Sequence, residues 1–226
     1  MSTACFSIRR VGRTALACAS LLLMTACATR QAPTYDYTAF KASRPKSILV
    51  LPPVNNTPDV MATPAVLAQV TLPLAESGYY VMPVTLVAET FKENGLSLPP
   101  EMHAVMPAKL QQIFGADAAL YLTVTRYGAS YAVLDSAAVV SVSARLVDLR
   151  SGQALWSGSA SASNNEGGGG NQGGIVGLLV AAVVKQILNS VTDASFPVAG
   201  MASQRLLSAR PGGLLYGPRS PRYGTD

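Results

Sequence analysis

The sequence predicts an α/β fold: a mixed β-sheet that contains an antiparallel meander and is flanked by helices, in a single domain over residues 45–210. Three observations predict it. Short apolar strands alternate with helical segments in the first half of the chain, as in sheets with helices packed on them. From residue 118 the hydrophobic period changes to two, which is typical of half-buried strands. Hydrophobic residues make up 49% of the 226 residues, enough for a sizeable core.

The first half of the domain combines short strands with helices. Residues 48–51 form an apolar run that ends at two prolines, as expected of a buried strand. A helix capped by Thr63 is expected to end at Gly78, with Pro73 kinking or shortening it. The other elements predicted here are a strand over 79–82, a short helix around 86–91 that stops at Gly95, and a helix over 107–114.

The second half is predicted to be the meander. Apolar and polar residues alternate through residues 118–125, SYAVLD, AVVSVSARLVDL and QALWSGSASAS, with a tight turn at 150–152. Trp156 is interpreted as a core or sheet-face anchor. Residues 164–174 predict a flexible glycine-rich loop, and a helix follows over 175–191. Because residues 175–184 are all apolar or glycine, this helix is either buried or offered to a partner or lipid. A last helix is expected over 197–207.

The first 26 residues have the parts of a secretory signal peptide. Arg9, Arg10 and Arg13 precede an apolar stretch that ends in small residues. Only 16 uncharged residues separate Arg13 from Arg30, whereas a membrane-spanning helix needs about 20. Without the three leader arginines the chain has 14 basic and 12 acidic residues. This balance does not indicate a nucleic-acid-binding protein.

Cys27 ends this leader, in the segment Met24-Thr25-Ala26-Cys27. The segment resembles the bacterial lipobox, with Met24 where leucine is usual. The resemblance implies that lipid such as palmitate is attached to the Cys27 thiol and that the leader is cut before it. All three cysteines lie in the first 27 residues, so no disulfide framework is expected later. The alternative is a plain signal peptide with a chance cysteine.

Residues 27–44 are then interpreted as a lipidated tether. Two or more acyl chains hold a protein stably on a bilayer. Ala28 stands where enteric lipoproteins retained at the inner membrane have aspartate, and this implies the outer membrane, with the domain on the periplasmic face. Residues 211–226 are expected to form an extended tail. Its Tyr216, Arg219, Arg222 and Tyr223 suggest contact with anionic headgroups or peptidoglycan, or a solvated tail.

Several segments resemble one known family in order and spacing. They are KSILVLPPVNNTPDV, AESGYYVMPV, FGADAALYLTVTRYG, ARLVDLRSGQALWSGSA and LLYGPRSPRY. The family is a bacterial lipoprotein family of unknown function, first noticed as a genome-derived neisserial vaccine antigen. More distantly the chain resembles curli-transport lipoproteins, lipoprotein activators of cell-wall synthases, and the amino-terminal domain of the Tol-system propeller protein. The resemblance implies a mixed α/β sheet, no enzymatic activity, and an envelope protein as partner, such as a curli-transport-like lipoprotein.

No set of residues predicts a catalytic, metal or cofactor site. His103 is the sole histidine and has no HExxH motif around it. The segment 128–132 lacks the second glycine of a nucleophile elbow, and the glycine-rich loop lacks the lysine and hydroxyl residue of a phosphate-binding loop. Asp135 and Asp148 are the carboxylates nearest the sheet, and Asp148 is interpreted as the cap of the turn at 150–152.

The sequence therefore predicts a lipid-anchored, non-enzymatic envelope protein that serves as an accessory or assembly factor in export or envelope biogenesis through protein–protein contacts. Two alternatives stay open. One is a glycan-binding or hydrolytic module with a polar pocket over the sheet. The other is a subunit of an oligomeric, curli-transport-like secretion complex, in which the chain pairs with copies of itself.

Overall fold

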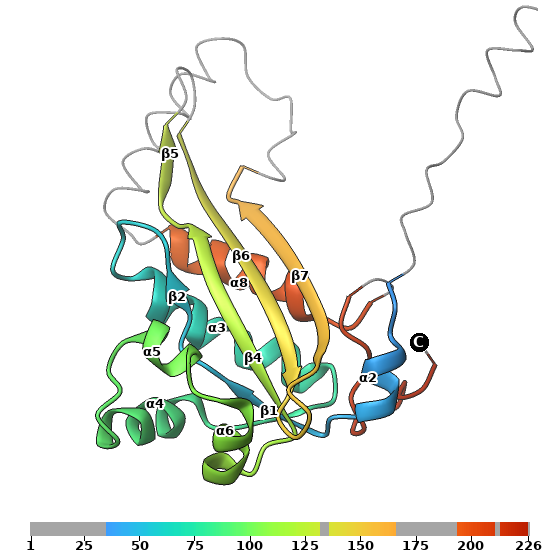
Figure 1. The fold of residues 1–226 in the computed structure, drawn as a ribbon. Coiled ribbons are helices and arrows are strands. Elements are labelled where there is room, and N and C mark those ends of the chain that lie inside the picture. The colour runs from blue at the N-terminus through green and yellow to red at the C-terminus, as the bar shows by residue number, and fades with distance from the viewer. Residues whose placement is uncertain (1–34, 132–135, 166–193, 211–212, 226) are drawn as a thin grey trace, which may run out of the picture. The chain divides into compact units, whose positions relative to one another are not determined.

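The structure is a computed structural model that describes residues 35–131, 136–165, 194–210 and 213–225 (Figure 1). Residues from Asp36 onward form one compact unit. Its helices are α2 (Thr38–Ser43), α3 (Ala62–Glu76), α4 (Val84–Glu93), α5 (Pro99–His103), α6 (Pro107–Phe114) and α8 (Ser195–Leu207). Its strands are β1 (Ser47–Val50), β2 (Val54–Asn55), β3 (Tyr80–Val81), β4 (Ala118–Arg126), β5 (Ala129–Tyr131), β6 (Ser136–Asp148) and β7 (Ala154–Ser163). No helix of the described segments has the length and apolar character needed to cross a membrane.

The seven strands form one mixed sheet. β1 runs parallel to β3 and β4, and the short β2 continues that side of β4 in parallel. β4, β6 and β7 are successive antiparallel neighbours, and β5 pairs with the far end of β6. The α/β fold with a mixed sheet, an antiparallel meander and flanking helices is thus confirmed.

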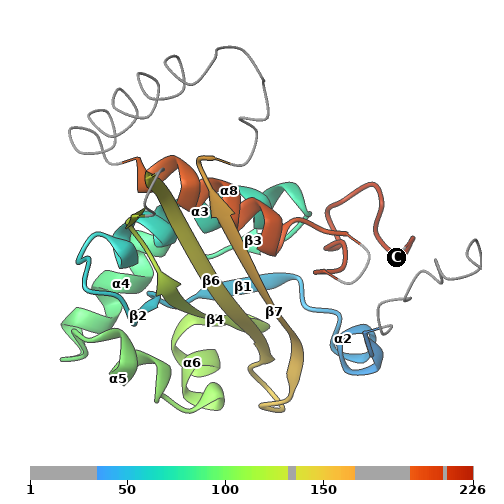
Figure 2. The same cartoon turned by 90° about the horizontal axis from the view of Figure 1, so that it is seen from above.

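Helices cover the two sides of the sheet unequally. α3 and α8 pack on each other, and α8 lies along β6 and β7. Figure 2 shows this pair on one side of the sheet and α5 and α6 on the other, where they lie near the β1 end of β4. The second side therefore has helices over only part of the strands.

Both sides of the sheet contribute to the core. On the α3/α8 side the alternate residues Ile48, Val50, Leu120 and Leu122 are fully buried. On the other side a cluster joins the sheet to α4, α5 and α6; it contains Leu49, Leu51, Val87, Phe91, Met102, Leu110, Ala119, Tyr121, Val147 and Leu149. The alternation of one strand thus supplies two separate apolar layers, as period-two patterning requires.

Two details of α3 differ from the sequence-based prediction. Thr63 does not cap the helix, because its hydroxyl donates to the Pro53 carbonyl at 3.0 Å. Asp59 meets the helix start instead and accepts from the Met61 amide at 2.9 Å. Pro73 is buried inside α3 and the helix continues to Glu76, so Pro73 does not shorten it. A proline removes only one helical hydrogen bond, and the buried packing around Pro73 compensates.

Three segments expected to be irregular are folded. α2 lies within the predicted tether, and Phe40 from its inner side is only 4% exposed. α5 includes His103, in a stretch expected to connect two helices. The C-terminal residues expected to be extended pack back on the domain: Leu214 is fully buried, and the Gly217 amide donates to the Ser77 carbonyl at 2.8 Å. The compact unit therefore includes residues on both sides of the expected boundaries at residues 45 and 210.

The predicted helix over 175–191 and most of the glycine-rich loop lie outside the described residues, as do Asp135, Cys27 and the whole leader.

Candidate functional site

A hydroxyl-lined surface occupies the side of the meander that lies opposite α8. Along β6 and β7 the residues that alternate with the core side chains are mostly serines. The register aligns them in rows across the strands: Thr123, Ser143 and Ser159 form one row, and Ser141 and Ser161 lie in the next. We call Thr123, Thr125, Ser141, Ser143, Ser157, Ser159 and Ser161 the hydroxyl face.

The members of the hydroxyl face are exposed or half-buried. Ser141 and Ser161 share a hydroxyl–hydroxyl hydrogen bond of 2.9 Å, and the Thr125 hydroxyl donates to the Ser141 carbonyl at 3.3 Å. Small uncharged hydroxyl groups present no bulk and no net charge, and each can both donate and accept. Such a surface suits close approach by another polypeptide.

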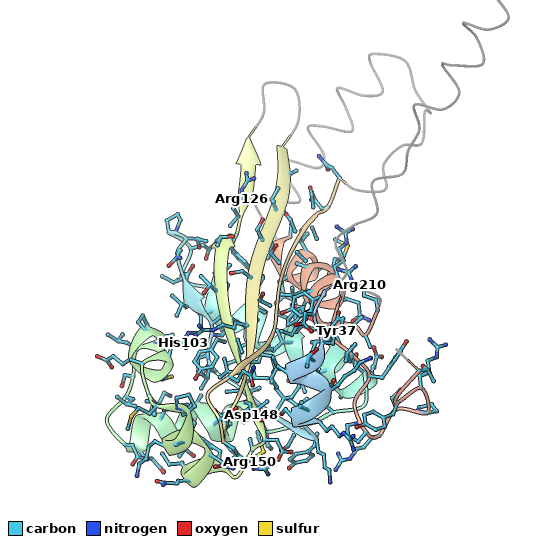
Figure 3. The ribbon with its side chains drawn as sticks, turned by 45° about the vertical axis from the view of Figure 1, so that its right-hand side comes forward. Tyr37, His103, Arg126, Asp148, Arg150 and Arg210 are labelled. Atoms are coloured by element: carbon cyan, nitrogen blue, oxygen red, sulfur yellow. The ribbon has the colours of Figure 1, made fainter. Side chains whose placement is uncertain are left out.

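Tyr121, Arg145 and His103 border the hydroxyl face where it meets α5. Figure 3 labels His103. The Arg145 guanidinium lies 5.2 Å from the centre of the Tyr121 ring, and the His103 ring meets Tyr121 edge-on at 5.3 Å. Together with Thr123, Ser143 and Ala144 they line a shallow pocket of about 240 Å³. Among the described residues that line it there is no carboxylate, whereas a glycoside hydrolase uses a pair of them.

His103 has a structural role in this arrangement. Its Nε2 lies 2.9 Å from the Pro52 carbonyl oxygen, and because a carbonyl can only accept, Nε2 carries the proton. Burial is the main cause that lowers the pKa of His103, the bond to Pro52 opposes it, and the charge of Arg145 adds to the lowering. His103 is therefore neutral at ordinary pH and ties α5 to the segment after β1.

The two acidic residues nearest the β1 end of the sheet organise turns. Asp148 accepts from the Arg150 and Ser151 amides at 2.9 and 2.7 Å, so the predicted turn cap is confirmed. Its other oxygen accepts from the Ser43 hydroxyl of α2 at 2.5 Å. Asp117, which the sequence analysis did not single out, pairs with Arg150 at 2.8 Å. Figure 3 shows Asp148 and Arg150 at the opposite end of the sheet from Arg126.

Burial and hydrogen bonding act in opposite directions on Asp148. Burial raises the pKa of its carboxyl group, and the hydrogen bonds from Ser43, Ser151 and Arg150 together lower it further than burial raises it. The carboxylate is thus ionised and fully engaged in holding the turn and α2. It is not available as an acid or a base. Among the described residues, no group of three or more histidine, cysteine or acidic side chains is placed to hold a metal ion.

Trp156 is a core residue, as predicted. It is 2% exposed and lies over Gly158, where an added Cβ would come within 2.5 Å of the indole ring. Gly158 therefore leaves room for the ring on the α8 side of β7. This packing explains why a glycine interrupts the strand at that position.

In the described part of the chain no strand pairs with the outer edge of β7, although α2 packs beside this strand. β7 pairs with β6 alone, and Figure 1 shows it as the outermost strand of the meander. Its sequence, ALWSGSASAS, has neither a charged residue nor a proline. Edge strands usually carry such residues, which discourage pairing with another chain. The ten-residue edge therefore lacks the common chemical protection.

The register shows which backbone groups point outward from β7. The Asn164 amide donates to the Ala138 carbonyl of β6 at 3.2 Å, so the backbone of Asn164 faces β6. In an antiparallel pair every second residue directs its amide and carbonyl toward the neighbouring strand. Ala160 and Ala162 therefore pair with β6, whereas the amide and carbonyl of Ser159 and Ser161 point away from it. The outward Ser161 carbonyl accepts from Arg205 of α8 at 2.9 Å, which protects that end of the edge.

The aromatic and basic residues of the C-terminal segment contact the domain and one another. The Arg219 guanidinium lies 5.1 Å from the centre of the Tyr80 ring. Arg222 lies 5.8 Å from the centre of the Tyr216 ring and donates to its hydroxyl at 3.0 Å. The predicted solvated tail is thus corrected for residues 213–220, which pack on the domain, while residues 221–225 are exposed.

Residues 35–219 match the family model described as "Putative lipoprotein GNA1162-like". The chain belongs to this family. It is 53% identical over 205 residues to the "Putative lipoprotein NMB1124/NMB1162" of Neisseria meningitidis serogroup B, an alignment that covers 90% of this chain and 94% of that protein. The resemblance to the neisserial lipoprotein family is thereby confirmed, and membership implies anchoring to a membrane.

The solved structure of a relative agrees with the fold. The crystal structure of lipoprotein GNA1162 from Neisseria meningitidis is similar at a TM-score of 0.51 and 54% identity, covering 64% of this chain and 99% of that one. A PelC dodecamer from Paraburkholderia phytofirmans aligns at a TM-score of 0.41 and 15% identity over 74% of this chain and 91% of that one.

The hydroxyl face and the open edge were not recognised from the sequence as a site. The signal was present, because serine recurs at every second position in SVSAR and SGSASAS. What the sequence did not contain was the identity of the edge strand, which depends on the order of strands in the sheet.

Proposed function

We propose that this protein is a non-enzymatic lipoprotein of the cell envelope that acts as an accessory or assembly factor by pairing a partner protein with the open edge of β7. Residues 1–26 are removed as a signal peptide, and lipid on Cys27 holds the chain at the outer membrane with its domain in the periplasm. The lipobox-like segment before Cys27 and membership of a lipoprotein family support the anchor.

The observation that supports the proposal is the outward amide and carbonyl of Ser159 on the outer edge of β7, beside the hydroxyl face. An added strand would bond to the outward amide and carbonyl of Ser159, the mode of recognition known as β-augmentation. The side chains of the added strand would continue the row of small, uncharged side chains to which Ser143 and Ser159 belong. A partner held in this way is recognised through backbone bonds and shape, and no reacting group is required.

Site-specific photocrosslinking in cells tests this contact. A photoreactive side chain at position 159 is expected to form an adduct with one exported envelope protein, identified by mass spectrometry. The matched control position is Lys109, which is exposed on α6, on a different element from β7. Labelling at position 159 that does not exceed labelling at position 109 would contradict the proposal.

A proline variant separates edge pairing from folding. For this test the photoreactive side chain is moved to position 161, which is exposed on the same face of β7. Ser159→Pro then removes an outward amide and leaves the inward ladder to β6 in place, so the adduct should be lost while the fold is kept. Ser159→Ala keeps the amide and should keep the adduct. If Ser159→Pro retained the adduct at wild-type yield, pairing along β7 would be excluded.

The mass of the crosslinked adduct and one binding assay test the two alternatives, an oligomeric complex and a glycan-binding module. An adduct with twice the mass of the chain would identify a second copy as the partner and favour the oligomeric complex. A glycan-binding module would use the pocket of Tyr121, Arg145 and His103, and Arg145→Ala would then abolish retention on a peptidoglycan column. We expect no change in retention.

Intact mass of the mature amino terminus tests the lipid on Cys27.

A further inference from the structure

A pocket of about 290 Å³ lies between α2 and the C-terminal segment. It brings together residues that are more than 170 positions apart in the sequence. Its lining is Phe40, Lys41, Arg44, Leu215, Tyr216, Tyr223 and Gly224. Neither the hydroxyl face nor the β7 edge contributes to it. The pocket therefore needs an explanation of its own.

The described lining of the pocket carries positive charge. Lys41 and Arg44 line it, and no acidic side chain of the described residues does. Arg222 adds a third cation beside the lining, because it lies over the Tyr216 ring and donates to the Tyr216 hydroxyl at 3.0 Å. Arginine binds phosphate with its planar fork, and lysine binds it as a point charge. Cationic groups beside aromatic rings suit a ligand with an anionic head and an apolar continuation.

Arg44 is held in an unusual backbone conformation at the wall of this pocket. It has a φ of 47°, the sole positive φ of a residue other than glycine in the described segments. It ends α2, and its amide donates to the Phe40 carbonyl at 2.9 Å. Glycine is usual at such a position because it has no Cβ to strain. The Arg44 Nε also donates to the Lys41 carbonyl at 3.2 Å, so the side chain binds the end of α2 and is held at the wall of the pocket.

The distance to the anchor points to the source of the ligand. Nine residues lead from Cys27 to Asp36, just before α2, and a fully extended chain of that length spans no more than about 30 Å. This step rests on the lipid anchor of the proposed function. With the anchor in place, α2 cannot lie far from the surface of the membrane, where anionic lipids attract basic side chains.

We propose that this pocket binds the headgroup of an anionic phospholipid, with Lys41 and Arg44 contacting the phosphate and Tyr216 and Tyr223 packing against the glycerol end. The contact supplements the covalent lipid and orients the domain on the bilayer. A headgroup site next to the anchor would also fix which way the β7 edge faces.

Calorimetric titration of the mature, membrane-extracted protein in a neutral maltoside detergent tests the site. The probes are dioctanoyl phosphatidylglycerol, dioctanoyl phosphatidylcholine and sodium phosphate. We expect saturable binding of the phosphatidylglycerol and much weaker binding of the other two. Equal affinity for the phosphatidylcholine would overturn the proposal, and so would inorganic phosphate that binds as tightly as the phosphatidylglycerol.

Variants assign the binding to the pocket. The double variant Lys41→Gln/Arg44→Asn removes both charges, and asparagine tolerates the left-handed conformation of residue 44. Its affinity for phosphatidylglycerol should fall about 25-fold, roughly fivefold for each charge. The matched control, Lys92→Gln/Lys109→Gln, removes two exposed charges on α4 and α6 and should leave the affinity unchanged. An equal loss in the control would show nonspecific attraction and contradict the site.

A glycine variant distinguishes a binding role of Arg44 from a structural one. Arg44→Gly relieves the backbone conformation, so the melting temperature should hold or rise while the affinity for phosphatidylglycerol falls. A variant that keeps full affinity would exclude Arg44 from the site.

Intact mass of each preparation separates the two proposals: an unmodified Cys27 contradicts the anchor, whereas a lipidated protein without phosphatidylglycerol selectivity contradicts only the pocket.

Discussion

The two sides of β6 differ in what they meet. On the α8 side the alternate residues Val140, Val142 and Leu146 are buried to 1% exposure or less. On the other side Ser141, Ser143 and Arg145 remain half-buried or exposed. At Val147 this second side also becomes buried, because the cluster beneath α4, α5 and α6 begins there. One strand thus serves a continuous core on one side and an open surface on the other.

Coverage by helices, more than the chemistry of the strand, distinguishes the two sides of β6. Both sides have small or β-compatible side chains that fit a pleated sheet. The α8 side is apolar from Ala138 to Leu146, and on the opposite side Val147 belongs to the buried cluster under α4, α5 and α6. Substitutions on the two sides should therefore have very different effects on stability.

The largest effect is expected on the covered side. Trp156→Ala should lower the free energy of unfolding by about 3–5 kcal/mol, because it removes a buried ring and leaves a cavity over Gly158. Chemical denaturation measures the change. A loss below about 1 kcal/mol would show that the α8 side of the meander is not a continuous core.

An intermediate effect is expected at Asp148, the charged residue at the end of the covered side of β6. Asp148→Asn should lower the free energy of unfolding by about 1–2 kcal/mol at neutral pH, because it disturbs hydrogen bonds to a carboxylate. Denaturation curves of both proteins at several pH values measure this change.

The pH dependence of that difference has a definite sign. Since the pKa of Asp148 is lowered in the folded protein, its stabilisation is complete above the unfolded pKa of about 4 and is lost as the pH falls through the folded pKa. The gap between wild type and Asp148→Asn should therefore narrow in acid. A gap that stays constant down to about pH 2 would contradict the assignment.

The smallest effect is expected on the hydroxyl face. Ser143→Ala should change the free energy of unfolding by less than about 0.5 kcal/mol, because the side chain lies on the open side of the sheet. The same denaturation assay measures it. A loss as large as that of Trp156→Ala would show that the face is part of the core, and the contrast between the two sides would fail.

Long elements with a strong period were predictable from the sequence. The meander follows from alternation over many residues, and α6 has the bounds that Pro107 and Gly115 predict. The short helices α2 and α5 were missed because isolated helices of five or six residues are not stable by themselves. They form because Phe40 and Met102 are buried by residues distant in sequence.

The candidate sites were less predictable than the fold. The hydroxyl alternation is visible in the sequence, but only the strand order makes β7 an edge. The basic residues of α2 and the tyrosines of the C-terminal segment carry no shared motif. The bond from the Tyr37 hydroxyl to the Gly213 carbonyl, 176 positions away at 2.5 Å, is one of the contacts that bring these segments together.

The sequence by itself determined the local features of this protein: the alternation of its strands, the helix ends at glycine and the family to which the chain belongs. Only the tertiary structure decided which alternate side stays open, which strand has a free edge, and that Lys41 and Arg44 meet Tyr216 and Tyr223. The physical reason is that periodicity acts over a few residues, whereas burial depends on segments that are distant along the chain.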